Sequence, residues 1–140
     1  MEQRNKDLIL RMNEEIWNRG NLDLIDEMFA EDIVLHFLPD DSQVKGLGEV
    51  RERVREHREA FPDWTETIEL ILAEGEYVAI HFVSSGTNQG SYAGQLPTGR
   101  QIRINEVSIF RIVDGKITEQ WLLPDLLSLN QQLGLLSTLK

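Results

Sequence analysis

The feature that most constrains the fold is the stretch QIRINEVSIFRIVDGKITEQWLL at residues 101–123. Apolar and polar side chains alternate on both sides of Asp114-Gly115, as they do in strands with one buried face. Asp-Gly is among the strongest short signals for a two-residue hairpin turn, because both turn residues need a positive φ. We therefore predict two antiparallel strands here. Residues 65–86 predict a second pair of strands, joined at Glu74-Gly75-Glu76.

Helical patterns come mostly before these strands. Residues 5–19 carry apolar side chains at helical spacing before Gly20, and Asn21 is a suitable N-cap for a second helix from 22 to about 29. A strand is predicted in DIVLHFLP, a third helix over 47–60, and a short helix over 126–133. Helices segregated from antiparallel strands indicate an α+β fold. No repeat or linker interrupts the chain, so we expect one domain over residues 1–140.

Composition excludes several classes of function. The net charge of −10 and the pI of about 4.7 disfavour nucleic acid, whose phosphates would be repelled. There is no Cys, and the three His lack the spacing of metal ligands, so we expect no metal. No phosphate-binding glycine loop is present, and no apolar run approaches the roughly 20 residues of a membrane span. We expect a cytoplasmic protein without a cofactor, nucleic-acid or membrane partner.

The hairpin also predicts which side chains share a face. If Val113 pairs with Lys116 and the register continues unbroken, one face is apolar but carries the carboxyl groups of Glu106, Glu119 and Asp125. The opposite face then holds Arg103, Asn105, Arg111 and Gln120. Acids among apolar side chains acquire raised pKa values, which is a signature of catalytic carboxyl groups. A β-bulge in either strand would invert this assignment.

Six motifs occur in an order that matches a known family. They are FPDW at 61–64, GEYVAIHFVSSGT at 75–87, GQLPTGR at 94–100, DGKITEQW at 114–121, Asp125, and NQQLG at 130–134. Together they resemble the SnoaL-like polyketide cyclases of the nuclear-transport-factor-2-like superfamily. The resemblance implies a cone: a strongly curved antiparallel sheet wrapped around three N-terminal helices, with an apolar pocket. The chain departs from the pattern at Asn88, where many relatives have His, and at Leu96-Pro97, where a double proline is expected.

The resemblance implies chemistry as well as shape. Similar cyclases close a ring by intramolecular aldol condensation, and other relatives are ketosteroid isomerases, dehydratases and epoxide hydrolases. Asp125 matches the family's general acid/base, although an Asp at this position could also be the N-cap of the helix over 126–133. A carboxylate suffices as base when the proton lies on a carbon between two carbonyl groups. We favour the reading of Asp125 as a pocket acid.

The remaining candidate residues surround this acid in the predicted arrangement. His81, within VAIHFV, is either a core histidine with a buried partner or a catalytic donor to a substrate carbonyl. We assign Asp125 and His81 as catalytic. The predicted substrate-binding residues are Trp17, His36, Tyr92, Glu106 and Trp121, although Trp side chains more often simply fill a core. His57 is assigned to a solvated helix face, and Glu119 to a structural pair with an Arg or His.

These observations predict a cofactor-free enzyme that transfers protons on a hydrophobic, carbonyl-bearing small molecule. Polyketide cyclisation or isomerisation is the favoured reaction, and a homodimer formed through the open sheet face is the expected assembly. The alternative is a module of the same fold that binds a small ligand, or only dimerises, without catalysis. Epoxide hydrolysis ranks third, because it needs an acid pair together with a residue that positions water.

Overall fold

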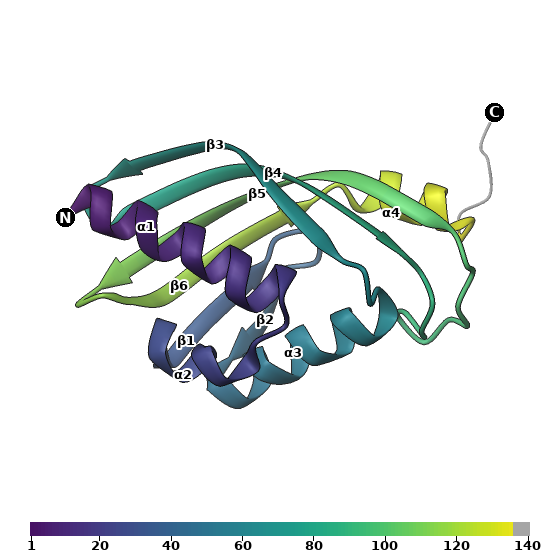
Figure 1. The fold of residues 1–140 in the computed structure, drawn as a ribbon, viewed down its shortest axis with the longest axis horizontal. Helices are drawn as coiled ribbons and strands as arrows, with labels where there is room; N and C mark the ends of the chain where they lie inside the picture. The colour runs from purple at the N-terminus through teal and green to yellow at the C-terminus, as the bar shows by residue number, and fades with distance from the viewer. Residues whose placement is uncertain (136–140) are drawn as a thin grey trace.

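A single sheet of six strands, in the order β2-β1-β6-β5-β4-β3, forms most of the molecule (Figure 1). The computed structural model describes residues 1–135. The strands are β1 (Phe29–Phe37), β2 (Ser42–Lys45), β3 (Thr65–Glu74), β4 (Tyr77–Thr87), β5 (Gln101–Val113) and β6 (Lys116–Pro124). Neighbouring strands are antiparallel except β1 and β6, which run parallel. The predicted curved sheet is confirmed, with this one parallel pair as an addition.

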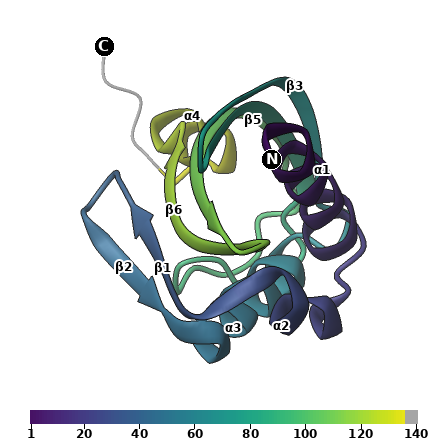
Figure 2. The ribbon, with the colours of Figure 1, turned by 90° about the vertical axis from the view of Figure 1, so that its left-hand side faces the viewer.

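The helices of residues 2–60 lie across the open side of the curved sheet, which gives the cone seen in Figure 2, and the C-terminal helix lies at one end of the sheet. They are α1 (Glu2–Met12) with its extension η1 (Asn13–Asn18), η2 (Leu22–Leu24), α2 (Ile25–Met28), α3 (Gly46–Ala60) and α4 (Leu126–Leu133). Helix α1 packs on β3 and β4, α3 packs on β1, and α4 packs against β5. The α+β prediction is therefore confirmed. In the described part of the chain no helix is long and apolar enough to cross a membrane.

Two groups of buried side chains hold the helices on the sheet. The larger group joins α1, α2 and α3 to the concave face and includes Ile9, Met28, Val54 and Phe110. The smaller group, at the other end of α3, comprises Ala60, Phe61, Trp64, Ile102, Ile104, Leu129 and Leu133. Each fully buried large side chain contributes about 1.5–3 kcal/mol to stability. The space between the two groups is where a cavity forms.

The first helix widens at its end, and this widening fixes the start of β3. The predicted helix over 5–19 is α1 followed by one wider, π-helical segment, η1. Asn18 at its end accepts a hydrogen bond from the backbone N–H of Glu66 at 2.6 Å and donates one to its carbonyl oxygen at 3.0 Å. Asn13 donates to the same carbonyl at 3.3 Å. Glu66 is thus held in place through its backbone.

The hairpin turn forms as predicted, but the register beyond it does not continue as predicted. Ile112 pairs with Ile117, after which Arg111 pairs with Glu119, so that Thr118 is an extra residue in β6. The Thr118 hydroxyl donates to the carbonyl oxygen of Arg111 at 3.2 Å, which stabilises this bulge. Because side chains alternate along a strand, one extra residue moves every later side chain to the other face.

The predicted face assignment of β6 is therefore wrong beyond the bulge. Gln120 and Leu122 are buried on the concave face, whereas Glu119 and Trp121 lie on the outer face. Strand β5 keeps its predicted orientation, with Glu106 on the concave side. The apolar inner surface is consequently built from a different set of β6 residues than the unbroken pattern indicates.

Asp125 begins the short helix α4. Its side chain accepts a hydrogen bond from the backbone N–H of Ser128 at 3.1 Å, which satisfies one of the free donors of the first helical turn. The helix ends at Gly134, whose φ of 75° is a left-handed conformation that glycine adopts readily. Asp125 is thus an N-cap, one of the two roles that the sequence left open.

This capping role predicts a small and chemically specific effect on stability. Replacing Asp125 with Ala should lower the free energy of unfolding by about 1 kcal/mol, because the first turn of α4 loses its cap. Asp125→Asn is the matched control, since Asn is an equally good cap and should leave stability nearly unchanged. Urea denaturation measures both values. Equal losses in the two variants would contradict a capping role.

Candidate functional site

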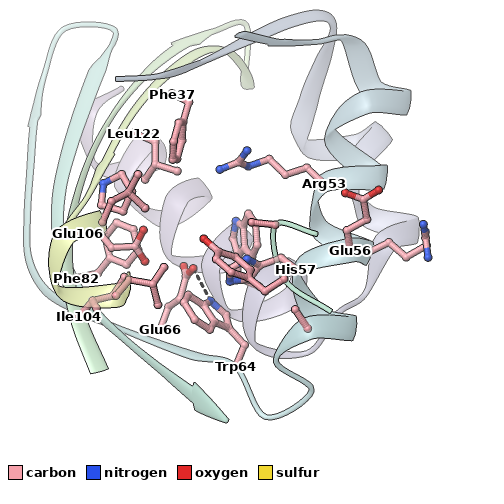
Figure 3. A pocket seen from close by; sticks show the side chains of 18 of the residues that line it. Phe37, Arg53, Glu56, His57, Trp64, Glu66, Phe82, Ile104, Glu106 and Leu122 are labelled. Atoms are coloured by element: carbon pink, nitrogen blue, oxygen red, sulfur yellow. Dashed lines mark hydrogen bonds between the residues drawn. The ribbon is translucent and has the colours of Figure 1, made fainter. Parts of the chain in front are cut away.

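A cavity of about 590 Å³ opens between α3, the connection over 88–100 and the concave face of the sheet (Figure 3). Its size lies within the usual range for small-molecule sites. Its walls are mainly apolar and include Trp17, Phe37, Ile80, Phe82, Ile104, Phe110, Leu122 and Leu129. A few polar side chains reach it, among them Arg53, His57, Glu66, Tyr92, Glu106 and Gln120. An apolar cavity with few polar groups is typical of a ligand site.

Glu66 is a buried acid in the wall of this cavity. It is 8% exposed, and its Oε2 accepts a hydrogen bond from the indole Nε1 of Trp64 at 2.9 Å (Figure 3). Burial raises the pKa of Glu66 well above its ordinary value, and the nearby charge of Glu106 raises it further. Burial therefore favours the protonated form of Glu66, which can donate a hydrogen bond.

Glu106, on β5, is the second buried acid. Its Oε2 accepts a hydrogen bond from the Ser84 hydroxyl at 2.5 Å. Burial raises the pKa of Glu106 to about 7, although the Ser84 hydrogen bond and the charge of Arg53 oppose this rise. Two carboxyl groups that share an apolar site cannot both ionise easily, so burial favours a state in which at least one of them keeps its proton.

Strand register brings the two acids and their serine together. Glu66 on β3 lies opposite Ser84 on β4, and Glu106 on β5 lies opposite Phe82, two residues before that serine. All of these side chains point to the concave face because each strand alternates. Glu66 is not among the site residues predicted from the sequence. Its place two residues before the apolar Ile68 in TETIEL is the signal that could have identified it as inward-facing.

Helix α3 supplies the opposite wall, where Arg53 and His57 lie one helical turn apart. The prediction that His57 lies on a solvated helix face is wrong. Its Nε2 is fully buried, and its ring makes edge contacts with Trp17 at 5.6 Å and Trp64 at 4.1 Å between centroids.

The environment of His57 determines its charge. Burial, reinforced by the charges of Arg53 and Arg58, lowers the pKa of His57 to about 3, so the ring is neutral at physiological pH. Helical spacing could have found this residue, because Val50, Val54 and His57 fall on one face of the helix. The many charges in RERVREHREAF conceal that pattern.

The connection over 88–100 brings Tyr92 to the cavity. Asn88 organises it: its side-chain amide donates to the carbonyl oxygen of Gly90 at 2.8 Å, and its Oδ1 accepts from the backbone N–H of Thr98 at 2.8 Å. Gly90 passes so close to α3 that a Cβ there would lie 2.3 Å from the carbonyl oxygen of Glu59. Asn88, noted as a departure from the family pattern, therefore shapes the mouth of the cavity.

The structure brings together only part of the predicted site. Trp17, Tyr92 and Glu106 line the cavity, whereas His36, His81, Trp121 and Asp125 do not. His81 lies on the outer face because the neighbouring Ile80 and Phe82 point inward, and its Nε2 is 2.9 Å from Oδ1 of Asn105. Asp125 is exposed at the start of α4.

His36 and Trp121 form a separate cluster on the outer face. His36 Nε2 lies 2.6 Å from Oε2 of Glu119, and the imidazole stacks on Trp121 with ring centroids 5.3 Å apart. The prediction that Glu119 pairs with an Arg or His is confirmed. Trp121 is outside the cavity because of the bulge at Thr118, and His36 because Leu35 and Phe37 point inward from β1.

Fold and cavity together define a cone-shaped α+β protein with an apolar cavity in the cone. Residues 7–133 match the family described as SnoaL-like polyketide cyclase, and the chain belongs to that family. No curated protein sequence matches it significantly. Within residues 1–135, no group of three or more His, Cys, Asp or Glu side chains is arranged to hold a metal ion.

Solved structures support the same assignment. The chain is similar to AclR from Streptomyces galilaeus, a candidate hydroxylase, with 31% identity and a TM-score of 0.86 over 100% of this chain and 87% of AclR. It is also similar to IdmH from Streptomyces antibioticus, a candidate polyketide cyclase, with 28% identity and a TM-score of 0.81 over 93% and 98% of the two chains. A SnoaL-like protein from Jannaschia sp. shares the fold at 23% identity and a TM-score of 0.89, over 97% of this chain and 95% of its own.

The buried acids predict a pH-dependent stability. The pKa of Glu106 is about 7 when folded and near the ordinary 4.5 when unfolded, so folding favours the protonated form. The contribution of that protonated form is fully present below pH 4.5 and is lost as the pH rises through 7. Glu106→Gln, which mimics the protonated acid, should raise the free energy of unfolding by up to about 3 kcal/mol at pH 8 and by little at pH 4.5. Urea denaturation at the two pH values measures this difference.

A matched control is Glu69→Gln, which removes an exposed carboxyl group from the same sheet. Its effect should be within about 0.5 kcal/mol and should be similar at both pH values. A Glu106→Gln variant whose stability changes equally at pH 4.5 and pH 8 would contradict the raised pKa.

Proposed function

We propose that this chain is a cofactor-free acid–base enzyme that closes or isomerises a hydrophobic, carbonyl-bearing small molecule by proton transfer. The observation that carries the proposal is the pair of buried carboxyl groups, Glu66 and Glu106, in an apolar cavity of about 590 Å³. The family to which the chain belongs supports this class of chemistry. Perturbed acids in a cleft are a recurrent feature of acid–base active sites.

The two acids take different roles. Ionised Glu106 removes a proton from a carbon next to a carbonyl group, and protonated Glu66 donates a hydrogen bond to the oxygen that becomes negative. In a ring closure the resulting enolate carbon bonds to a second carbonyl carbon of the same molecule. The proton then passes to the new alkoxide oxygen, so no other reactant is needed.

The surroundings suit these roles. Trp64 donates to Oε2 of Glu66, which leaves Oε1 to carry the proton toward the cavity. Ser84 orients Glu106 through a 2.5 Å hydrogen bond. The apolar side chains of Phe82 and Phe110 keep water away from the pair, which strengthens electrostatic interactions there. Trp17 and Tyr92 serve as walls for a planar ring.

We assign the acid/base role to this pair instead of Asp125 and His81. Asp125 is exposed, and its carboxylate accepts the backbone N–H of Ser128. His81 is on the outer face, with its Nε2 directed to Asn105. Neither side chain contacts the cavity, so proton transfer to a ligand inside it falls to Glu66 and Glu106.

A general proton-transfer probe tests this proposal without knowledge of the substrate. The wild-type protein should convert 5-nitrobenzisoxazole to its phenolate about 100-fold faster than Glu106→Gln, because Glu106 is the base. The rate should rise with pH through about 7, the pKa of Glu106. Absorbance of the phenolate measures the reaction.

Asp125→Asn serves as the control and should retain the full rate, since Asn still caps α4. Equal rates in the wild type and Glu106→Gln would contradict the proposal. If the probe also binds in the cavity under those conditions, the result would favour the alternative, a module that binds small ligands without catalysis.

The outer face of the sheet supports a homodimer as the assembly. It exposes a contiguous group of large apolar side chains on β3, β4, β5 and β6: Leu70, Leu72, Tyr77, Val107, Ile109 and Leu123. Monomers rarely expose such a patch. Arg103, Asn105 and Arg111 flank it as predicted, whereas Gln120 faces the cavity instead.

The dimer is tested by size-exclusion chromatography with light scattering. The wild type should have the mass of two chains, and Val107→Lys should have the mass of one, because a charge at the centre of the patch cannot be desolvated cheaply. Leu10→Lys, at an exposed apolar position on α1, is the control and should remain dimeric. A monomeric wild type at about 100 μM would refute the dimer.

A further inference from the structure

Arg53 is a cation that projects from α3 into the apolar cavity. Figure 3 shows its guanidinium extended from the helix into the open space, across from the wall that carries Glu106. The guanidinium lies over the ring of Phe37, with Cζ 5.0 Å from the ring centroid. Within residues 1–135, no carboxylate lies within ion-pair distance of it, and its side chain makes no hydrogen bond.

The other arginines of α3 are all engaged. Arg51 pairs with Asp26, and Arg55 pairs with Glu52 and Glu59 on the helix surface. Arg58 donates to the backbone carbonyl oxygen of Trp17 at 2.5 Å. Arg53 therefore differs from its neighbours in lacking an ion-pair or hydrogen-bond partner among the described residues. This difference marks it as a residue with a role in the cavity.

Leaving a guanidinium in an apolar cavity is unfavourable. Burial lowers the pKa of Arg53, and the negative charges of Glu106 and Asp40 only partly offset this. The side chain nevertheless stays charged, as arginines do in proteins. Its planar fork of N–H donors fits a carboxylate in two parallel hydrogen bonds. A ligand with a carboxylate would supply the partner that the described residues do not.

The positions of the charged groups favour one orientation of a ligand in the cavity. Arg53 lies on the helical wall, and the two acids lie on the sheet wall, with the cavity between them (Figure 3). An apolar molecule with a carboxylate at one end would place that end at Arg53. Its opposite end would then lie at Glu66 and Glu106. The same arrangement disfavours a ligand whose negative charge is at the reacting end, because ionised Glu106 would repel it.

We propose that the substrate of this cavity is an apolar carboxylate, with Arg53 as the residue that recognises its anionic group. This inference rests on the proposed function, since it names the substrate class of the same site. Arg53 selects and orients the substrate through its carboxylate, and Glu106 acts on a carbon at the other end. The body of the molecule lies between Trp17 and the apolar side chains of the sheet.

A matched pair of probes tests the inference. Isothermal titration with the full chain compares 2-naphthoate with 2-naphthamide, which has nearly the same shape but no charge. Naphthoate should bind about tenfold more tightly, as expected for charged hydrogen bonds to a guanidinium. A pH of 6 is suitable, because Glu106 is then largely protonated and does not repel the anion.

Variants locate the preference. Arg53→Met keeps the length and loses the charge, so it should weaken naphthoate binding about tenfold and leave naphthamide within about twofold. Arg51→Met, which removes a surface arginine from the same helix, should change neither affinity. Arg53→Lys retains charge without the planar fork and should have an intermediate affinity for naphthoate. If Arg53→Met does not fold, the naphthoate affinity of Arg53→Lys relative to that of the wild type still tests the role of Arg53.

The outcomes separate this inference from the proposed function. Equal affinity of the wild type for the two probes, or a preference that survives in Arg53→Met, would overturn the carboxylate assignment. Turnover of 5-nitrobenzisoxazole that depends on Glu106 would in that case still support the acid–base proposal. Conversely, a preference that depends on Arg53, in a protein without turnover, would uphold recognition of a carboxylate and refute catalysis.

Discussion

The cavity depends on one extra residue in β6. Without the bulge at Thr118, Glu119 and Trp121 would point into the cone, and Gln120 and Leu122 would face outward. The observed register instead gives the cavity an apolar wall from Leu122. It also places Glu119 beside His36 on the outer face, where the carboxylate has a partner at 2.6 Å. The bulge thus keeps a further acid out of a cavity that already contains two buried ones.

Burial of the two remaining acids, Glu66 and Glu106, is unfavourable, and hydrogen bonds from neighbouring residues offset part of that free-energy cost. Trp64 and Ser84 each donate a hydrogen bond to one of them. Asn13 and Asn18 hold the backbone of Glu66, so this side chain cannot easily swing out to water. The cheapest remaining response to burial is a shared proton. Raised pKa values are therefore a consequence of how the sheet is anchored, and they bring one acid into the range in which it can exchange protons at neutral pH.

Much of the fold could be predicted from local patterns. The Asp114-Gly115 turn, the alternation in β3 to β6 and the helical spacing before Gly20 each depend on neighbouring residues, so the sequence carries them directly. Several residues of the candidate site, among them His57 and Glu66, could not be predicted in the same way. A bulge depends on how two strands pair, which neither strand shows by itself. His57 is buried by contacts with Trp17, which is far from it in the sequence, and with Trp64, which lies outside its helix. The concave-face position of Glu106 is predictable because β5 has no bulge. The predicted position of Trp121 is wrong because this residue follows the bulge in β6.

Asp125 belongs to a sequence motif that resembles the family, but it lies outside the cavity that contains the candidate site. Asp125 lies at an exposed helix start outside the cavity, and its hydrogen bond from Ser128 serves the helix. The pair of Glu66 and Glu106 differs because burial makes the second ionisation unfavourable, so an acid and a base are present side by side at one pH. Ring closure needs both, one to take a proton from carbon and one to support the developing oxyanion. With Arg53 on the facing wall, the proposed carboxylate would have one end at the guanidinium and the other end at Glu66 and Glu106, the only buried acids among the residues that the structure describes.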